Sequence, residues 1–327
     1  MGTAGTIMPL VYILIFPGFV FLVGFGLLAD FVDRKLVARM QTRVGPPWYQ
    51  PVADLFKLLS KEDIVTEDAD RSAVALIPVF GLAAVATAFL YVPLWTAEWP
   101  FSFTGDIIAV VYLLTIPAFV LVLLGWYSPN PFGSIGTGRV ITQLFGYEVP
   151  FTLALLTPAI ALQSWQIRDI LAYQQDNLWL IVTMPVAFYV AVVALVGKLE
   201  RIPFDIPHAE TEIVEGPMTE YTGRKLALLK LMIQTEMVVG GAIIAVFFLG
   251  GPYIPGVGLL TAFGPIVAHV IGFFVTVIKI LFVIFLLSVT KATFARLRIE
   301  QMVQWCLVWL GIPILLQILI VILVGTA

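Results

Sequence analysis

Long apolar runs alternate with short polar connections along this chain of 327 residues. A helix that crosses the hydrocarbon core of a bilayer needs about 20 consecutive, mostly apolar residues. Eight runs reach roughly this length: 8–29, 73–95, 107–126, 140–162, 178–197, 226–250, 265–289 and 302–324. The pattern predicts an all-α integral membrane protein of about eight transmembrane helices, with residues 1–327 forming a single membrane domain.

The positive charges fall almost entirely on one side of this arrangement. Sixteen of the 18 Lys and Arg residues lie in or beside four alternate connections: 30–72, 127–139, 198–225 and 290–301. Cytoplasmic connections of membrane proteins carry an excess of Lys and Arg. We therefore expect a multi-pass protein of the cell membrane with these connections in the cytoplasm and both termini on the outer side.

One of these connections contains an amphipathic segment. In "PVADLFKLLSKE", the apolar residues Val52, Leu55, Phe56 and Leu59 recur at the spacing of one helix face, and Pro51 suits a first helical turn. The segment predicts a short helix on the cytoplasmic surface, lying along the membrane or under a partner.

Composition excludes several functions. Hydrophobic residues make up 60% and charged residues 12% of the chain, and the mean hydropathy is +1.01. The net charge of −3 gives no reason to expect nucleic acid as a partner. The one cysteine, Cys306, can neither form an internal disulfide nor supply the roughly four thiolates of an iron–sulfur cluster. We expect no cofactor or metal bound by this chain.

Three charged residues lie about two turns or more inside predicted helices: Glu148 and Glu236 toward cytoplasmic ends, and Lys279 near the middle of its run. A charge at membrane depth costs about 2.5–3.5 kcal/mol or more, so it usually faces the protein interior and has a function. The alternatives are that the glutamates reach the cytoplasmic surface and that Lys279 serves a structural ion pair.

The connection "ERIPFDIPHAETEIVEGPMTEY" holds six carboxylates: Glu200, Asp205, Glu210, Glu212, Glu215 and Glu220. A solvated acidic loop is one interpretation. Interleaved apolar residues favour another, in which the connection packs into the bundle beside Glu148 and Glu236. Crowded carboxylates in a low-dielectric setting cannot all ionise, which suits groups that take up and release protons. Glu200, at the helix edge beside Lys198 and Arg201, is expected to matter least.

Four blocks resemble the family of the H subunit (subunit 1 in mitochondria) of respiratory complex I: "RVGPPWYQPVADLFKLLSKE", "GYEVPF", "RIPFDIPHAETEIVEGPMTEYTGRK" and "KATFARLRIEQMVQW". They occur in the family's order and bracket seven of the eight predicted helices, so the resemblance extends over nearly the whole chain. The resemblance implies a membrane subunit at the junction with a hydrophilic redox arm, with a funnel of acidic residues that passes the effect of electron transfer to ion-pumping subunits.

By position, the resemblance implies coupling or proton-transfer roles for seven residues: Glu148, Asp205, His208, Glu210, Glu212, Glu215 and Lys279. The depth of Glu236 in its apolar run adds it to this set. His208 stands where many members have glutamate. Contacts with partner subunits are expected at Arg34, Arg39, Arg43, Trp48, Arg201, Arg224, Arg296 and Arg298.

Two departures from the quinone-reducing members concern the electron acceptor. This chain reads "EGPMTEYT" where they have "AGYHTEYS", and "RVGPPWYQ" lacks about half a dozen residues of a segment that helps form their quinone tunnel. Both departures resemble membrane-bound hydrogenases and sulfane sulfur reductases. We therefore expect a junction subunit of a ferredoxin-driven, ion-translocating complex that reduces protons or a sulfur compound.

The partners implied are soluble iron–sulfur and large hydrogenase-like subunits carrying [4Fe–4S] clusters or a NiFe centre, antiporter-like and small membrane subunits, and the lipid bilayer. Three alternatives stay open: a quinone-binding member of the same family in an NADH, ferredoxin or F420H2:quinone oxidoreductase, a free-standing secondary transporter, and a structural anchor with an inert funnel. A transporter would predict pseudo-symmetric halves, and the sequence shows no internal repeat.

Overall fold

The computed structural model of the chain describes residues 10–255 and 264–324, which are helical and contain no strand in these ranges. Seven helical segments there are long and apolar enough to span a membrane, and Pro185–Lys198 is a shorter apolar helix. The all-α, multi-pass membrane architecture predicted from the sequence is confirmed.

The longer helices of the bundle are α2 (Phe19–Met40), α4 (Arg71–Leu90), α5 (Asp106–Trp126), α6 (Pro131–Leu162), α9 (Pro185–Lys198), α11 (Gly223–Leu249), α12 (Pro265–Thr293) and α14 (Ile312–Val324). The shorter ones are α3 (Gln50–Ser60), α7 (Ile167–Asp176), α8 (Leu180–Thr183) and α13 (Ile299–Trp305), which continues through a π-helical turn at Cys306–Gly311 into α14. The surface helix predicted over residues 51–62 is α3.

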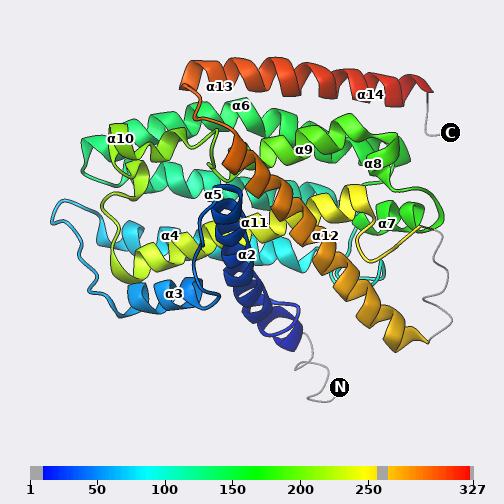
Figure 1. The fold of residues 1–327 in the computed structure, drawn as a ribbon, viewed down its shortest axis with the longest axis horizontal. Helices are drawn as coiled ribbons and strands as arrows, with labels where there is room; N and C mark the ends of the chain where they lie inside the picture. Colours follow the sequence, from blue (N-terminus) through cyan, green and yellow to red (C-terminus); the bar gives the residue numbers. More distant parts are fainter. Residues whose placement is uncertain (1–9, 256–263, 325–327) are drawn as a thin grey trace.

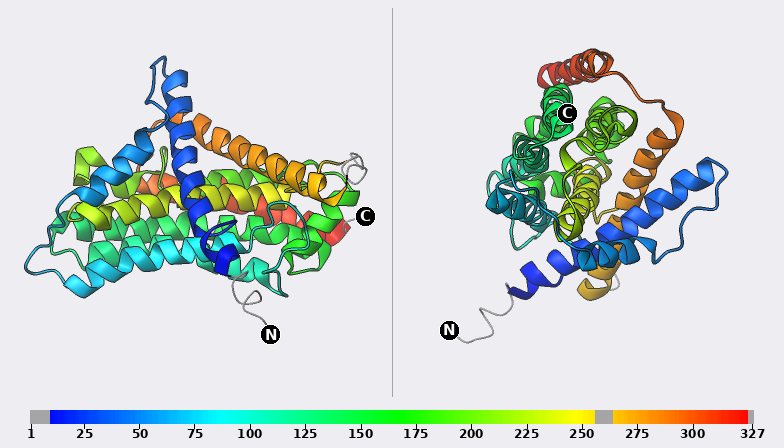
Figure 2. Two further views of the ribbon diagram at one scale, coloured as in Figure 1. Left: turned by 90° about the horizontal axis from the view of Figure 1, so that it is seen from below. Right: turned by 90° about the vertical axis from the view of Figure 1, so that its left-hand side faces the viewer.

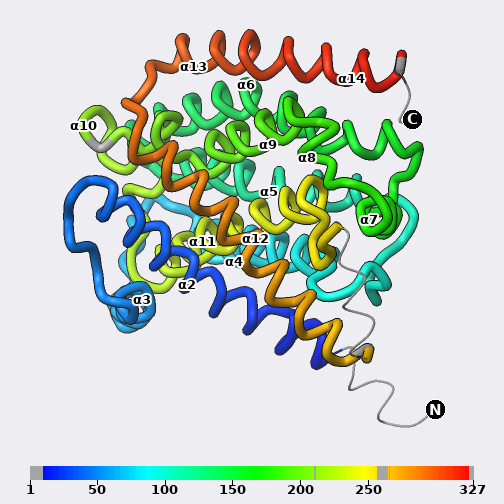
Figure 3. The backbone as a smooth tube through the Cα atoms, turned by 45° about the vertical axis from the view of Figure 1, so that its right-hand side comes forward, coloured from blue at the N-terminus to red at the C-terminus, as the bar shows by residue number. Residues whose placement is uncertain are grey.

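Helix α11 forms the centre of the bundle, and most of its residues are buried. The end-on view of Figure 2 shows it enclosed by the other helices. Helices α2 and α12 run side by side across one face of the bundle (Figure 3), and α13 and α14 lie along α6 (Figure 1). Helix α11, the most buried helix, therefore contacts most of the other long helices.

The connections that carry most of the cations lie at one end of the molecule, here called the basic end. In Figure 1 this end is on the left, with α3 and α10 (Glu210–Ile213), whereas α7 and α8 are on the right. The placement of these connections at a common end agrees with the alternation of charge along the sequence.

Several helices extend beyond the apolar runs that predict them. Helix α2 continues past the predicted end at residue 29, to Met40, and α6 begins at Pro131 rather than at residue 140. A prediction from hydropathy places the end of a helix at the first charged residues. Asp30 and Asp33 are nevertheless buried in α2, where neighbouring side chains neutralise them.

The fifth predicted run, residues 178–197, is not one continuous helix. It divides into α8 and α9 at Met184, whose φ of −130° and ψ of 57° are not helical. The proline that follows disfavours a helical conformation at Met184, and its fixed φ suits the first turn of α9. The α9 helix is consequently short, and its last residue, Lys198, lies inside the protein.

Candidate functional site: a buried cluster of ionisable residues

The acid-rich connection between α9 and α11 is packed against the bundle. It contains three single turns, η1 (Ile206–His208), α10 and η2 (Gly216–Met218). Most of its apolar side chains are buried, namely those of Phe204, Ile206, Ile213 and Met218, whereas Val214 is exposed. The packed interpretation of this segment is therefore correct and the solvated loop is not.

Close backbone approach at Gly216 gives the connection its compact form. Gly216 has a φ of +53°, and a Cβ atom there would lie 2.1 Å from the carbonyl oxygen of Pro207. Only glycine combines a positive φ with the absence of a side chain. On the facing helix, a Cβ atom at Gly136 would lie 2.6 Å from Cδ of Pro217. The sequence "EGP" thus allows η2 to lie against both η1 and α6.

A buried ion pair joins α9 to α6. The Nζ atom of Lys198 lies 2.7 Å from Oε2 of Glu148, and the Lys198 side chain is 0% exposed. The ammonium also lies 5.5 Å from the ring centre of Tyr147 and 5.3 Å from that of Phe151. Glu148 is thus directed into the bundle and paired, rather than extended to the surface.

Glu236 of the central helix α11 belongs to the same cluster. It is 3% exposed, and Lys198, Glu200 and Glu148 all act on it electrostatically. Four buried polar atoms around this cluster have no hydrogen-bond partner among the described residues: Gln143 Oε1, Tyr147 OH, Glu148 Oε1 and Glu236 Oε1. The cluster contains polar atoms that are free to bind a proton or water.

A second pair extends the cluster into the acid-rich connection. His208 Nε2 lies 2.5 Å from Oε2 of Glu200, and both residues are largely buried. Burial alone would lower the pKa of His208, but the neighbouring Glu200 carboxylate outweighs it and holds this pKa above its ordinary value. The expectation that Glu200 takes part in a surface ion pair at the helix edge is therefore wrong: Lys198, Glu200 and Arg201 lie within the protein.

This pair predicts a dependence on pH. Because the pKa of His208 is raised by folding, its stabilising contribution is complete below the ordinary histidine pKa and is lost as the pH rises through the raised value. We expect residues 206–222 to exchange amide hydrogens faster at about pH 9 than at about pH 6, after correction for intrinsic rates. In His208→Gln, this excess at the higher pH should be absent. An equal excess in the variant would exclude His208 as its cause.

Of the other predicted carboxylates that the structure describes, Asp205 is buried, whereas Glu212 and Glu215 lie nearer the surface. Arg296 holds Asp205 through two hydrogen bonds of 2.8 and 2.5 Å, and Arg139 lies 2.6 Å from Glu212, whose side chain is 57% exposed. Glu215 is half-buried, with its carbonyl oxygen 3.4 Å from His208 Nδ1. The side chain of Glu210 lies outside the described part of the structure. The predicted acids thus form an interior group and a rim rather than one uniform funnel.

A polar cluster that the sequence pattern did not indicate lies beside this site on α2. Asp33 is bound by Arg201 at 3.0 Å, by Lys291 at 3.3 Å and by the Ser288 hydroxyl at 2.8 Å. One turn earlier, Asp30 pairs with Arg34 at 2.7 Å. The spacing of Asp30, Asp33 and Arg34 on one helical face was the available signal. These contacts join α2 and α12 to the start of the acid-rich connection.

Lys279 does not join the carboxylates. Its ammonium donates to the carbonyl oxygens of Gly251 at 2.8 Å and Tyr253 at 2.6 Å, and lies 4.6 Å from the Trp179 ring centre. The two carbonyl groups follow the C-terminus of α11, at the end opposite the basic end (Figure 1). Lys279 therefore lies apart from the carboxylates and makes no ion pair among the described contacts, and its coupling role stays a prediction. Its ammonium satisfies two buried backbone carbonyl oxygens.

Replacing Lys279 by methionine should lower stability without uncoupling the complex. The change leaves two buried carbonyl oxygens without their donor, which costs about 1–3 kcal/mol for each unsatisfied group. We expect a lower midpoint of thermal unfolding but an unchanged number of ions moved per electron. A fall in that number at normal stability would instead place Lys279 on the ion path.

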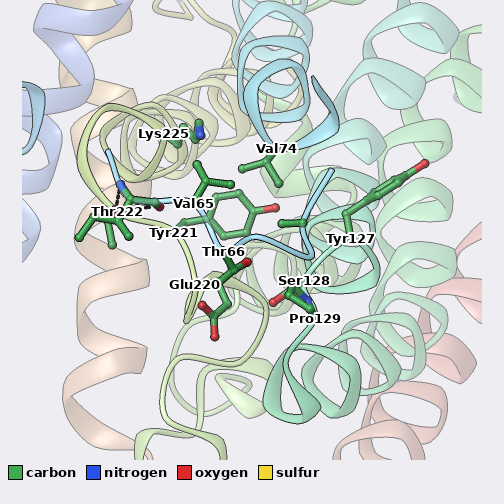
Figure 4. A pocket seen from close by; sticks show the side chains of 12 residues that line it. Val65, Thr66, Val74, Tyr127, Ser128, Pro129, Glu220, Tyr221, Thr222 and Lys225 are labelled. Atoms are coloured by element: carbon green, nitrogen blue, oxygen red, sulfur yellow. Dashed lines mark hydrogen bonds between the residues drawn. The ribbon is translucent and has the colours of Figure 1, made fainter. Parts of the chain in front are cut away.

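Three connections are fastened together at the basic end, beside the central helix (Figure 4). The Ile64 amide donates to Thr222 Oγ1 at 3.0 Å, Lys225 lies 3.2 Å from Asp63, and Asn130 donates to Glu220 at 2.6 Å. The ring of Tyr221 fills the junction and leaves a cavity of only about 10 Å³, room for one water molecule. The "TEYT" residues thus hold three connections closely packed together at this end.

The residues predicted to contact partners divide into two groups. Those with exposed side chains at the basic end are Arg39, Arg43, Trp48, Arg224 and Arg298. The other three are already engaged within the chain: Arg34 with Asp30 and Asp54, Arg201 with Asp33, and Arg296 with Asp205. Buried Arg201 is not free to bind a partner, whereas Arg34 and Arg296 remain partly exposed.

Comparisons with known proteins agree with this arrangement. The family model described as NADH dehydrogenase matches residues 11–323. The chain is 33% identical over 281 residues to the H subunit of the NADH-quinone oxidoreductase of Carboxydothermus hydrogenoformans, covering 84% of this chain and 77% of that protein. It is 31% identical over 302 residues to NADH-quinone oxidoreductase subunit 8 of Thermus thermophilus, with 87% and 80% covered.

A solved structure has the same fold. It is a chain of the membrane-bound sulfane sulfur reductase, an archaeal respiratory membrane complex, with a TM-score of 0.83 and 25% identity, covering 92% of this chain and 95% of that one. Matches of this extent to a family and a fold identify a membrane subunit of a complex-I-like oxidoreductase, which works with other subunits. The chain belongs to the NADH dehydrogenase family, that of the H subunit of complex I.

Proposed function

We propose that this chain couples electron transfer in partner subunits to the movement of H⁺ or Na⁺ across the cell membrane. The observation that carries the proposal is the buried cluster of Glu148, Lys198 and Glu236 around the central helix. It connects through Glu200 and His208 to a connection at the basic end. Ionisable groups buried at membrane depth are costly and usually serve ion pathways.

The proposed partners dock at the basic end. The exposed basic residues there accompany exposed apolar side chains, including those of Trp48 and Phe56, and such mixed surfaces are typical of protein interfaces. We assign the docked arm to soluble iron–sulfur and hydrogenase-like subunits with [4Fe–4S] clusters, and the membrane neighbours to antiporter-like subunits. The basic end then faces the cytoplasm and both termini lie outside.

For the electron acceptor we propose protons or a sulfur compound, with ferredoxin as donor and no quinone. The short "RVGPPWYQ" segment and the sequence "EGPMTEYT" support this assignment. In the structure, Gly216 of this sequence packs closely against Pro207, and Tyr221 packs among the connections at 64–66 and 127–129. A quinone-binding role is the second candidate, favoured by relatives at 33% and 31% identity that are named as subunits of NADH-quinone oxidoreductases.

Quinone-site inhibitors distinguish these two candidates. We expect them to leave ferredoxin-driven turnover of the intact complex unchanged, because no quinone enters the chain. Metal analysis of the largest soluble partner then separates the remaining acceptors, since nickel would indicate a hydrogenase. Inhibition at concentrations that saturate a quinone reductase, or a quinone headgroup bound beside residues 215–221, would contradict the quinone-independent assignment.

A further inference from the structure

The charges of the buried cluster do not match one to one. The carboxylates are those of Glu148, Glu200 and Glu236, whereas the cationic partners are Lys198 and His208. His208 pairs with Glu200, and Lys198 pairs with Glu148. Among the described contacts, Glu236 has no ion pair, although it lies within the electrostatic reach of Lys198. One ammonium therefore serves two buried carboxyl groups.

The contacts of this ammonium leave it free to move. An ammonium carries three N–H donors, yet Lys198 makes a single described hydrogen bond, to Glu148. The nearby rings of Tyr147 and Phe151 attract a cation without fixing its direction. The other buried lysine differs, because two carbonyl oxygens hold Lys279. Lys198 is the buried lysine whose position depends on an ionisable partner.

Electrostatics limits how the cluster can be charged. An ionised carboxylate without a countercharge is strongly disfavoured in a medium of low dielectric constant. With one ammonium for Glu148 and Glu236, one of the two carboxyl groups is ionised and the other is protonated. The other titratable groups facing the ammonium are Tyr147 on α6 and Glu200 in the connection, and Glu200 is already paired with His208.

We propose that Lys198 is a shared counter-charge that exchanges between Glu148 and Glu236 as a proton passes between them. The O–H bond at Glu236 breaks and an O–H bond forms at Glu148, while the ammonium moves from Glu148 toward Glu236. The three groups have the same total charge before and after this step. The inference rests on the proposed coupling function and assigns Lys198 as the residue that positions the charge.

Infrared spectroscopy of the assembled complex tests this assignment, because protonated carboxyl groups have a separate stretching band. In wild type, Glu236 contributes one protonated carboxyl at neutral pH, and Glu236→Gln should remove it. Lys198→Met removes the cation and should add one protonated carboxyl, which is absent again in Lys198→Met/Glu148→Gln. Lys198→Arg keeps the charge and should show the wild-type number.

The rate of ion movement during electron transfer provides the second measurement. Lys198→Met should lower it by about 10²-fold or more, the usual effect of losing a proton-transfer step, and Lys198→Arg should restore part of it. A wild-type carboxyl band in Lys198→Met would overturn the shared counter-charge. If Lys198→Met does not assemble, a wild-type band in Glu236→Gln would overturn it. Wild-type ion movement in both Glu148→Gln and Glu236→Gln would reject the coupling function itself.

Discussion

Replacing Glu148 by glutamine should nearly abolish ion translocation by the assembled complex. The amide keeps the shape of the side chain but can neither hold a transferable proton nor pair with the Lys198 ammonium, 2.7 Å away. Loss of a proton-carrying group typically slows the step it serves by about 10²–10⁴-fold. The measurement is the rate of ion uptake driven by electron transfer in proteoliposomes. Electron transfer should slow as well, since the two steps are linked.

Two glutamates serve as controls for this variant. Glu98, near the opposite end, is 81% exposed and lies 3.5 Å from Arg168, so Glu98→Gln should change little. Glu212→Gln should have an intermediate effect, because the structure places this residue on the rim, beside Arg139. Wild-type translocation and turnover in Glu148→Gln would mean that the buried cluster is only structural.

The largest loss of stability is expected for Asp33→Ala. The Asp33 side chain is 1% exposed and neutralises both Arg201 and Lys291. Removing one member of a buried ion pair typically costs about 3–5 kcal/mol, since the remaining charge stays buried without a partner. We expect a large fall in the yield of assembled complex and in its midpoint of thermal unfolding.

Asp54 provides the matched comparison. It also pairs with an arginine of α2, Arg34, but its side chain is 39% exposed. An exposed ion pair contributes only about 0–1 kcal/mol, so Asp54→Ala should assemble nearly as wild type does. Equal losses in the two variants would contradict the role of Asp33 as the buried junction of α2, α12 and the acid-rich connection.

The membrane fold could be predicted from hydropathy because each spanning helix must present apolar side chains to lipid. The ends of the helices could not. Asp30 and Asp33 look like the start of a polar loop, yet they continue α2 because Arg34, Arg201 and Lys291 neutralise them. Two of those partners, Arg201 and Lys291, come from distant parts of the sequence. Similarly, hydropathy does not show that residues 178–197 divide at Met184, because the division follows from the proline after it.

The site was predicted in part. The sequence indicates that the acid-rich connection packs beside Glu148 and Glu236, because its acids alternate with apolar residues. It does not reveal that Lys198 and Glu200 are buried, since both lie at a helix end where charges are usually solvated. Lys279 lies at a depth that suggests function, but the carbonyl groups it binds can be located only in three dimensions.

The most direct test of the central claim is gentle purification of the tagged chain from its native membrane. We expect the chain to emerge with soluble subunits, at least one carrying an iron–sulfur cluster, and with further membrane subunits. Ion movement by the purified material should depend on electron transfer through those subunits. Recovery of a stable, partner-free chain that transports ions without electron transfer would contradict the claim.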